Sequence, residues 1–81
     1  MRVRYSGRFL QQYADAPAEV RKAFNKQSIF LLDNLSHPSL RAKKYDEAIG
    51  LWQARVNRTW RFYSTVEGGE YHLHDMKPHP K

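Results

Sequence analysis

The stretch Gly50–Tyr63, which reads GLWQARVNRTWRFY, is the sequence feature that most limits the possible folds of this chain. Large apolar residues alternate in it with arginines and other polar residues. Side chains of a strand point alternately to the two faces of a sheet, so this period predicts strands with one apolar and one cationic face. The rest of the chain must therefore supply elements that cover the apolar face.

The size and composition of the chain limit how that cover can be built. The chain has 81 residues and no cysteine, so we expect one domain, residues 1–81, without a disulfide framework or a thiolate metal site. Five Tyr, four Phe and two Trp are available instead, and aromatic side chains bury large areas in a small core. The lack of cysteine agrees with a reducing compartment such as the cytoplasm.

The charge balance indicates the class of partner. Fourteen Lys and Arg residues against eight Asp and Glu residues give a formal net charge of +6. A small basic protein attracts polyanions or an acidic protein. We recognise neither a signal peptide nor a membrane-spanning run in the sequence, so we expect a cytoplasmic protein with no membrane partner.

The N-terminal part of the chain predicts a strand and two helices. Met1–Tyr5 alternates apolar and basic residues, as a half-buried strand does. Ser6 can cap a helix that runs to about Ala14. A second helix is expected over Pro17–Leu35, because proline is favoured in the first turn of a helix. Four apolar residues of this helix form a stripe that should face the core: Val20, Phe24, Leu31 and Leu35.

The segment His37–Ile49 shows neither the helix period nor the strand period, and we expect a connecting loop there. Leu40 and Tyr45 should anchor this loop to the core. Such a loop can carry charge simply as a solvated surface, but its place directly before the arginine-bearing strands favours binding. Three basic residues lie close together in it: Arg41, Lys43 and Lys44.

The C-terminal part predicts three strands: Leu51–Val56, Thr59–Val66 and Tyr71–Met76. Asn57 and Arg58 form the first turn, while Gly68 and Gly69 supply the positive φ of the second. The tail Lys77–Lys81 contains two prolines, so we expect it to leave the sheet and cross its end. The expected fold class is α+β, with an N-terminal strand at a sheet edge, a helical hairpin and a three-stranded antiparallel meander whose helices cover one face.

The face that the helices leave open is predicted to be a cationic groove. Alternation puts Gln53 and Arg55 on one face of the first meander strand, and Arg61 and Tyr63 on the same face of the second. Phosphate is the expected ligand, because a guanidinium offers it a planar fork of two donors. Four further basic residues should lie at the rim: Lys43, Lys44, Arg58 and Lys77.

The histidines give one candidate for proton transfer and no metal site. His72 and His74 alternate on one strand, but without a cysteine or an evident carboxylate partner we predict no metal there. His79 lies between two prolines in the tail, near the expected end of the sheet, where an imidazole could donate a proton. We find no phosphate-binding glycine loop, no nucleophile triad and no paired catalytic carboxylates.

Three runs of the sequence together resemble a known family. These runs are HPSLRAKKY, GLWQARVNRTWRFY and YHLHDMKPHPK. They resemble the RelE/ParE superfamily of toxins from bacterial and archaeal toxin–antitoxin pairs, and the similarity covers nearly the whole chain. The pattern W-x-A-R-V-N-x-x-W-R-F-Y and the lead-in H-P-x-L-R-x-K-K are typical of the branch that cleaves mRNA. The resemblance implies a RelE-like fold.

The resemblance further implies a ribonuclease that needs no metal or other cofactor and cuts mRNA on the ribosome. Arg61 matches the strand arginine that stabilises the phosphate, and His79 matches a histidine acid near the C-terminus. Three residues match basic positions that replace a carboxylate base or hold phosphates: Lys43, Lys44 and Arg55. The chain departs from one branch by lacking a glutamate in the loop before the meander. The expected RNA contacts come from Arg41, Arg58, Tyr63, Lys77 and Lys81.

Two other functions fit the same residues. A toxin of this fold can act without nuclease activity, by binding a protein as gyrase inhibitors do. A basic RNA- or ribosome-binding module would carry the same charges and would bind in a salt-dependent way without catalysis. For the toxin, the resemblance implies an acidic antitoxin that covers the basic face. Steep loss of activity on removing Arg61 or His79 would distinguish an enzyme from a binding module.

Overall fold

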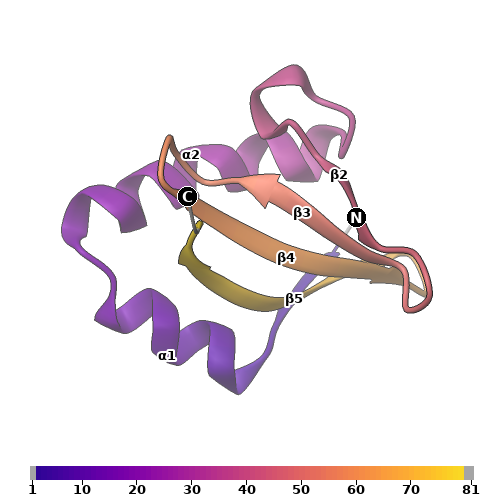
Figure 1. The fold of residues 1–81 in the computed structure, drawn as a ribbon, viewed down its shortest axis with the longest axis horizontal. Helices are drawn as coiled ribbons and strands as arrows, with labels where there is room; N and C mark the ends of the chain where they lie inside the picture. The colour runs from indigo at the N-terminus through magenta and orange to yellow at the C-terminus, as the bar shows by residue number, and fades with distance from the viewer. Residues whose placement is uncertain (1, 80–81) are drawn as a thin grey trace.

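The computed structural model describes residues 2–79 as a five-stranded mixed sheet with two α-helices against one of its faces (Figure 1). The described part has no helix that is long and apolar enough to cross a membrane. The elements follow in this order: β1 (Arg2–Tyr5), α1 (Gly7–Asp15), α2 (Ala18–Asp33), the 3₁₀ helix η1 (Pro38–Leu40), β2 (Lys43–Asp46), β3 (Leu51–Arg55), β4 (Trp60–Glu67) and β5 (Glu70–Pro78).

The predicted helical hairpin is confirmed, including its cap. The Oγ of Ser6 accepts a hydrogen bond from the Phe9 amide at 3.0 Å, which satisfies one of the free N–H groups that begin α1. The same hydroxyl donates to the carbonyl of His74 at 2.9 Å and so fixes α1 to β5. Pro17 is the N-cap of α2, and this helix ends at Asp33, two residues before the predicted end.

The strand order is β1-β5-β4-β3-β2, with β1 parallel to β5 and every other pair antiparallel. This arrangement confirms the α+β class and the edge position of the first strand. The prediction of a plain loop over His37–Ile49 was wrong, because η1 and β2 lie there and β2 extends the meander by one strand. A register shift between Lys44 and Asp46 interrupts the alternation of side chains, and this irregularity hides the strand period in the sequence.

The tail also differs from its prediction. β5 continues to Pro78, and the amide of His79 still donates to the carbonyl of Thr59 at 2.7 Å. Because ladder bonds alternate in direction, the N–H that Pro78 lacks would point away from β4. β1 pairs with β5 only as far as Leu73, so β5 is an edge strand at this end and tolerates proline.

The core lies between the helices and the sheet. The Phe24 ring on α2 lies 5.1 Å from that of Phe9 on α1 and 5.4 Å from that of Phe62 on β4, measured between centroids. Leu31 and Leu40 are fully buried beside them, as predicted. Covering one face with both helices leaves the opposite face of β2 to β5 free for polar and charged side chains (Figure 1).

A cationic candidate site on the open sheet face

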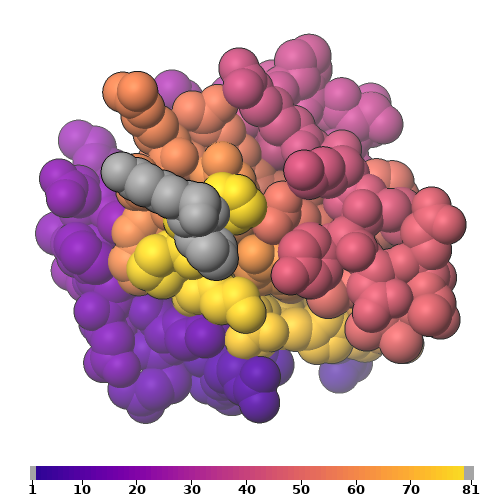
Figure 2. Space-filling view, viewed as in Figure 1, coloured from indigo at the N-terminus to yellow at the C-terminus, as the bar shows by residue number. Residues whose placement is uncertain are grey.

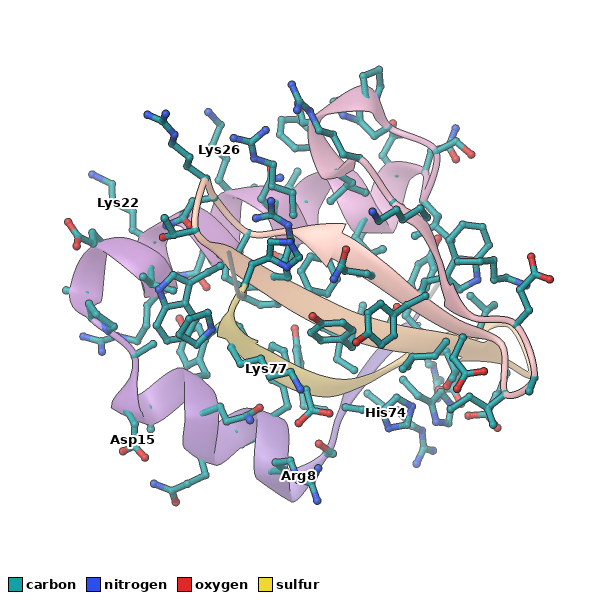
Figure 3. The ribbon with its side chains drawn as sticks, viewed as in Figure 1. Arg8, Asp15, Lys22, Lys26, His74 and Lys77 are labelled. Atoms are coloured by element: carbon teal, nitrogen blue, oxygen red, sulfur yellow. The ribbon has the colours of Figure 1, made fainter. Side chains whose placement is uncertain are left out.

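Three basic side chains form a row across the open face. Arg55 on β3 is directly opposite Arg61 on β4, and Arg61 is directly opposite Lys77 on β5. Directly opposed residues in antiparallel strands present their side chains on the same face. The prediction that Arg55 and Arg61 share the open face is therefore confirmed, and Figure 3 shows Lys77 on the sheet face turned away from α2.

The turn between β3 and β4 orients both arginines. The carbonyl of Asn57 accepts hydrogen bonds from Nη1 of Arg61 at 2.7 Å and from Nε of Arg55 at 3.3 Å. The side-chain oxygen of Asn57 accepts from the amides of Thr59 and Trp60 at 2.9 and 2.8 Å, which fixes the turn itself. Asn57 was predicted only as a turn residue, and its carbonyl adds a role in positioning the two guanidinium groups.

The row carries positive charge without compensation. Burial lowers the pKa of Arg61 from its ordinary value, and the positive charges of Arg55 and Arg41 lower it further. Within residues 2–79, the ion pairs closer than 4.0 Å involve other side chains. A bound anion would relieve the repulsion between the positive charges of Arg61, Arg55 and Arg41. The described cations without a carboxylate at that distance include Arg41, Lys43, Lys44, Arg55, Arg58, Arg61 and Lys77.

Two tyrosine rings, those of Tyr45 and Tyr63, form an aromatic floor next to the row of Arg55, Arg61 and Lys77, which we call the arginine row. Tyr63 is only 3% exposed although it lies on the open face, and its hydroxyl accepts a hydrogen bond from Nε2 of Gln53 at 3.0 Å. The ring of Tyr45 contacts it edge-on at 5.2 Å between centroids, and Nζ of Lys77 lies 5.1 Å from the Tyr63 centroid. The predicted core anchoring by Tyr45 was wrong, because its side chain is 61% exposed on this face.

The structure separates the two lysines that the sequence grouped together. Lys43 is opposite Gln53 and so shares the open face with Tyr63. Lys44 is opposite Trp52, and its Nζ lies 5.1 Å from the centre of that indole. Trp52 is on the same face of β3 as the buried Ala54. Lys44 therefore projects from the helix-covered side of the sheet.

The C-terminal end of β5 brings His79 close to the arginine row. The bond from the His79 amide to Thr59 continues the ladder two residues beyond Lys77, so alternation directs both side chains to the same face. Arg58 is exposed at the neighbouring turn. The space-filling view shows this turn, the end of β5 and the segment from η1 to β2 around the same part of the face (Figure 2). Lys81 lies outside the described residues.

The two histidines of β5, His72 and His74, belong to a separate network near β1. Nε2 of His74 lies 2.9 Å from the Thr65 hydroxyl, and Nδ1 of His72 lies 3.3 Å from a carboxylate oxygen of Glu67. Within residues 2–79 no group of three or more His, Asp or Glu side chains is placed to hold a metal ion. Both of these contacts are with side chains of β4, those of Thr65 and Glu67.

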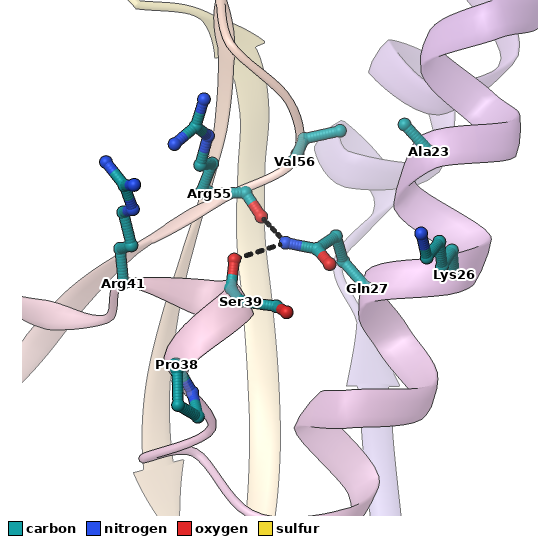
Figure 4. A pocket seen from close by; sticks show the side chains of 8 residues that line it. All are labelled: Ala23, Lys26, Gln27, Pro38, Ser39, Arg41, Arg55 and Val56. Atoms are coloured by element: carbon teal, nitrogen blue, oxygen red, sulfur yellow. Dashed lines mark hydrogen bonds between the residues drawn. The ribbon is translucent and has the colours of Figure 1, made fainter.

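One buried amide joins three elements behind the arginines. Nε2 of Gln27 on α2 donates to the carbonyl of Ser39 at 2.8 Å and to that of Arg55 at 2.7 Å (Figure 4). The bond to Ser39 holds the end of η1, where Arg41 adopts a left-handed φ of 45°. Sequence reasoning missed Gln27, although its spacing from Phe24 and Leu31 places it on the predicted apolar stripe. A polar residue on such a stripe was the available signal.

Replacing Gln27 with leucine should lower the free energy of unfolding by about 2 kcal/mol, because two buried carbonyls lose their donor. Urea denaturation measures the change. Gln11→Leu is the matched control, since Gln11 is an exposed residue that bonds only Asp15 on its own helix. Equal effects of the two substitutions would show that the Gln27 bonds contribute nothing specific.

Comparison with known proteins supports the fold and no closer relationship. Neither a protein-family model nor a curated protein sequence matches the chain. Solved structures do match over nearly the full length. A YoeB/ParE toxin from Agrobacterium tumefaciens superposes with a TM-score of 0.82 at 14% identity, covering 99% of this chain and 100% of that one.

Two further structures give the same result. The YoeB dimer from Staphylococcus aureus matches with a TM-score of 0.80 at 16% identity, covering 99% and 98% of the two chains. In the RelB–RelE antitoxin–toxin complex from Methanococcus jannaschii, the match has a TM-score of 0.77 at 14% identity and covers 93% and 88%. The chain therefore has the fold of the RelE and YoeB toxins, as the resemblance of its sequence runs to the RelE/ParE superfamily implied.

Proposed function

We propose that this protein is the toxin of a RelE/YoeB-type toxin–antitoxin pair and that it cleaves mRNA without a metal ion. The observation that carries this proposal is the row of Arg55, Arg61 and Lys77 on the open sheet face. The row has no compensating carboxylate within the described residues. A polyanion with closely spaced phosphates suits such a surface, and arginine is well shaped for phosphate.

The reaction is an attack of a ribose 2′-oxygen on its adjacent phosphorus. The bond between phosphorus and the 5′-oxygen breaks, leaving a 2′,3′-cyclic phosphate and a 5′-hydroxyl end. Arg61, with Arg55 beside it, stabilises the negative charge that develops on the non-bridging oxygens. His79 donates the proton that the leaving 5′-oxygen takes up. Lys43, the lysine on the same face, stands in place of the carboxylate base: its positive charge stabilises the 2′-oxygen while the 2′-hydroxyl proton is lost to solvent water.

The aromatic floor gives the same face a means of holding a base. Tyr45 is exposed and packs against Tyr63, so a nucleobase can stack on its free side. The exposed Arg58 at the turn extends the cationic surface toward further phosphates. Such contacts act on single-stranded RNA, and the mRNA in a translating ribosome is presented in this form. Function on the ribosome places the protein in the cytoplasm.

An acidic antitoxin is the second partner of this proposal. The solved structures with this fold include a RelB–RelE complex and a YoeB–YefM complex from Staphylococcus aureus. A net charge of +6 provides long-range attraction for a partner of opposite charge. Covering the arginine row with carboxylates would exclude RNA and so neutralise the toxin.

Primer extension on a message tests the proposal. The purified protein is added to a reconstituted translation reaction, and the message is mapped with and without ribosomes. We expect new 5′ ends at positions linked to codons, and these ends should form only when ribosomes translate the message. They should still form after addition of a metal chelator at a concentration that spares the ribosomes. Intact message would refute the nuclease. Intact message together with DNA damage in expressing cells would instead favour a gyrase inhibitor.

The separation of the two neighbouring lysines gives a matched pair of variants. Lys43→Ala should lower the cleavage rate about tenfold or more, because it removes a cation from the reacting face. Lys44→Ala should change the rate less than threefold, since Lys44 projects from the opposite face beside Trp52. Single-turnover cleavage on programmed ribosomes measures both rates. A larger loss for Lys44→Ala would contradict the assignment of Lys43.

A further inference from the structure

A cavity beside the arginine row has a composition that the proposed reaction does not explain. It lies between α2, η1 and the end of β3, and its volume is about 430 Å³. Two small apolar residues, Ala23 and Val56, form part of its wall (Figure 4). Its polar lining consists of Gln27, Ser39 and three cations: Lys26, Arg41 and Arg55.

The three cations approach the cavity from three different elements. Arg41 follows η1, Arg55 ends β3 and Lys26 belongs to α2. Arg41 and Arg55 extend side by side in the same direction, and Lys26 stands across the cavity on α2 (Figure 4). The cavity lining includes no acidic residue. The fold thus gathers three positive charges without any of the carboxylates that would make them a structural ion pair.

The backbone that carries the two arginines of the cavity is fixed by a bond from α2. Gln27 bonds the carbonyls of Ser39 and Arg55, and so holds the two segments that carry the arginines at one distance from α2. Arg41 keeps a left-handed backbone with φ of 45°, a conformation that costs free energy in a residue other than glycine. Such strain and a buried clamp are features of sites that hold a ligand in one geometry.

We propose that this cavity is a second phosphate subsite, which binds the RNA phosphate next to the one held at Arg61. The inference rests on the proposed function. Arg55 connects the two subsites, because it lines the cavity and is also directly opposite Arg61. Lys26 and Arg41 complete the second subsite. Binding at two successive phosphates fixes the register of the RNA strand, so that one phosphorus is aligned with Arg61 and His79.

The surroundings favour a nucleic-acid phosphate over a carboxylate of a protein partner. The cavity is continuous with the arginine row through one shared side chain, as two neighbouring phosphates of one strand require. Guanidinium groups form charge-assisted bidentate bonds with phosphate oxygens, and a lysine adds a further point charge. The cavity lining offers such a phosphate two guanidinium groups and one ammonium group, those of Arg41, Arg55 and Lys26.

The test compares Lys26→Gln with Lys22→Gln, a control on an exposed lysine one helical turn earlier and outside the cavity lining. The probe is a labelled single-stranded RNA whose riboses are 2′-O-methylated, so that it binds without being cleaved. We expect Lys26→Gln to weaken binding several-fold and to reduce the slope of log affinity against log salt concentration by about 0.7, the value for one phosphate contact. Lys22→Gln should leave both quantities unchanged.

Neutral methylphosphonates, introduced one linkage at a time, locate the contact. In the wild type, a methylphosphonate at either of two adjacent linkages should weaken RNA binding. In Lys26→Gln, only one of these two replacements should still weaken it. If Lys26→Gln behaves like Lys22→Gln on RNA, the subsite is refuted even where the wild type binds and cleaves. Loss of antitoxin binding alone, with RNA binding intact, would also refute it. A wild type that neither binds nor cleaves RNA refutes the proposed function as well.

Discussion

Arg61→Ala is expected to lower the rate of mRNA cleavage by roughly 10²- to 10³-fold, the usual loss when one preorganised donor to a developing anion is removed. Arg61 lies between Arg55 and Lys77 on the open face, and its Nη1 is fixed by the carbonyls of Asn57 and Trp60. The charge is therefore already in place before the phosphorane forms. Single-turnover cleavage on programmed ribosomes measures the effect, and relief of growth arrest on expression is its cellular counterpart.

Two companion variants show whether the loss of activity in Arg61→Ala comes from the missing guanidinium or from a disturbed hairpin. Arg58→Ala removes a guanidinium from the same hairpin at an exposed turn position and should cost less than fivefold. Arg61→Lys keeps the charge but loses the planar fork, so it should recover only part of the activity. Circular dichroism and a cooperative thermal transition confirm that each variant is folded. A fully active, folded Arg61→Ala protein would remove Arg61 from the mechanism.

His79→Ala is expected to lower the cleavage rate by roughly 10²-fold or more, as loss of a positioned general acid does. The His79 amide is bonded to Thr59 at 2.7 Å, which holds this residue beside the start of β4 and thus near Arg61. The leaving 5′-oxygen needs a proton as its bond to phosphorus breaks. Cleavage assays with the same programmed ribosomes measure the loss.

A modified substrate distinguishes proton donation by His79 from a structural role. A bridging sulfur in place of the 5′-oxygen leaves without a proton, so the His79→Ala protein should cleave this RNA nearly as fast as the wild type does. His74→Ala is the matched control, because His74 is on β5, the strand that precedes His79, but is bonded to Thr65. A defect that persists on the sulfur substrate would show that His79 acts in some other way.

The sequence predicted the strands and helices well wherever one period holds over a whole element. The alternation in Leu51–Arg55 and the serine cap before α1 are local properties, because backbone geometry and capping depend on residues a few positions apart. The same patterns predicted that Arg55 and Arg61 share a face. Similarity of sequence runs added the RelE-like fold, which the solved structures support at 14–17% identity.

The predictions failed where a register irregularity or a neighbouring strand decides the outcome. The shift between Lys44 and Asp46 conceals β2, so the sequence did not reveal the ordinary alternation that places Lys43 and Tyr45 on one face and Lys44 on the other. A proline in the tail ordinarily indicates the end of a strand. Here β1 stops pairing at Leu73, so the strand can continue and carry His79 to the end of the sheet.

The sequence by itself determined an amphipathic hairpin, the helices that cover its apolar side and the excess of positive charge. Only the tertiary structure decided which charges meet. Lys26, Arg41 and Arg55 are far apart along the chain, and no local period relates them. They line one cavity because Gln27 joins α2 to η1 and β3. Such a meeting depends on long-range packing, which sets the distances between elements, whereas sequence periods set only the direction of each side chain.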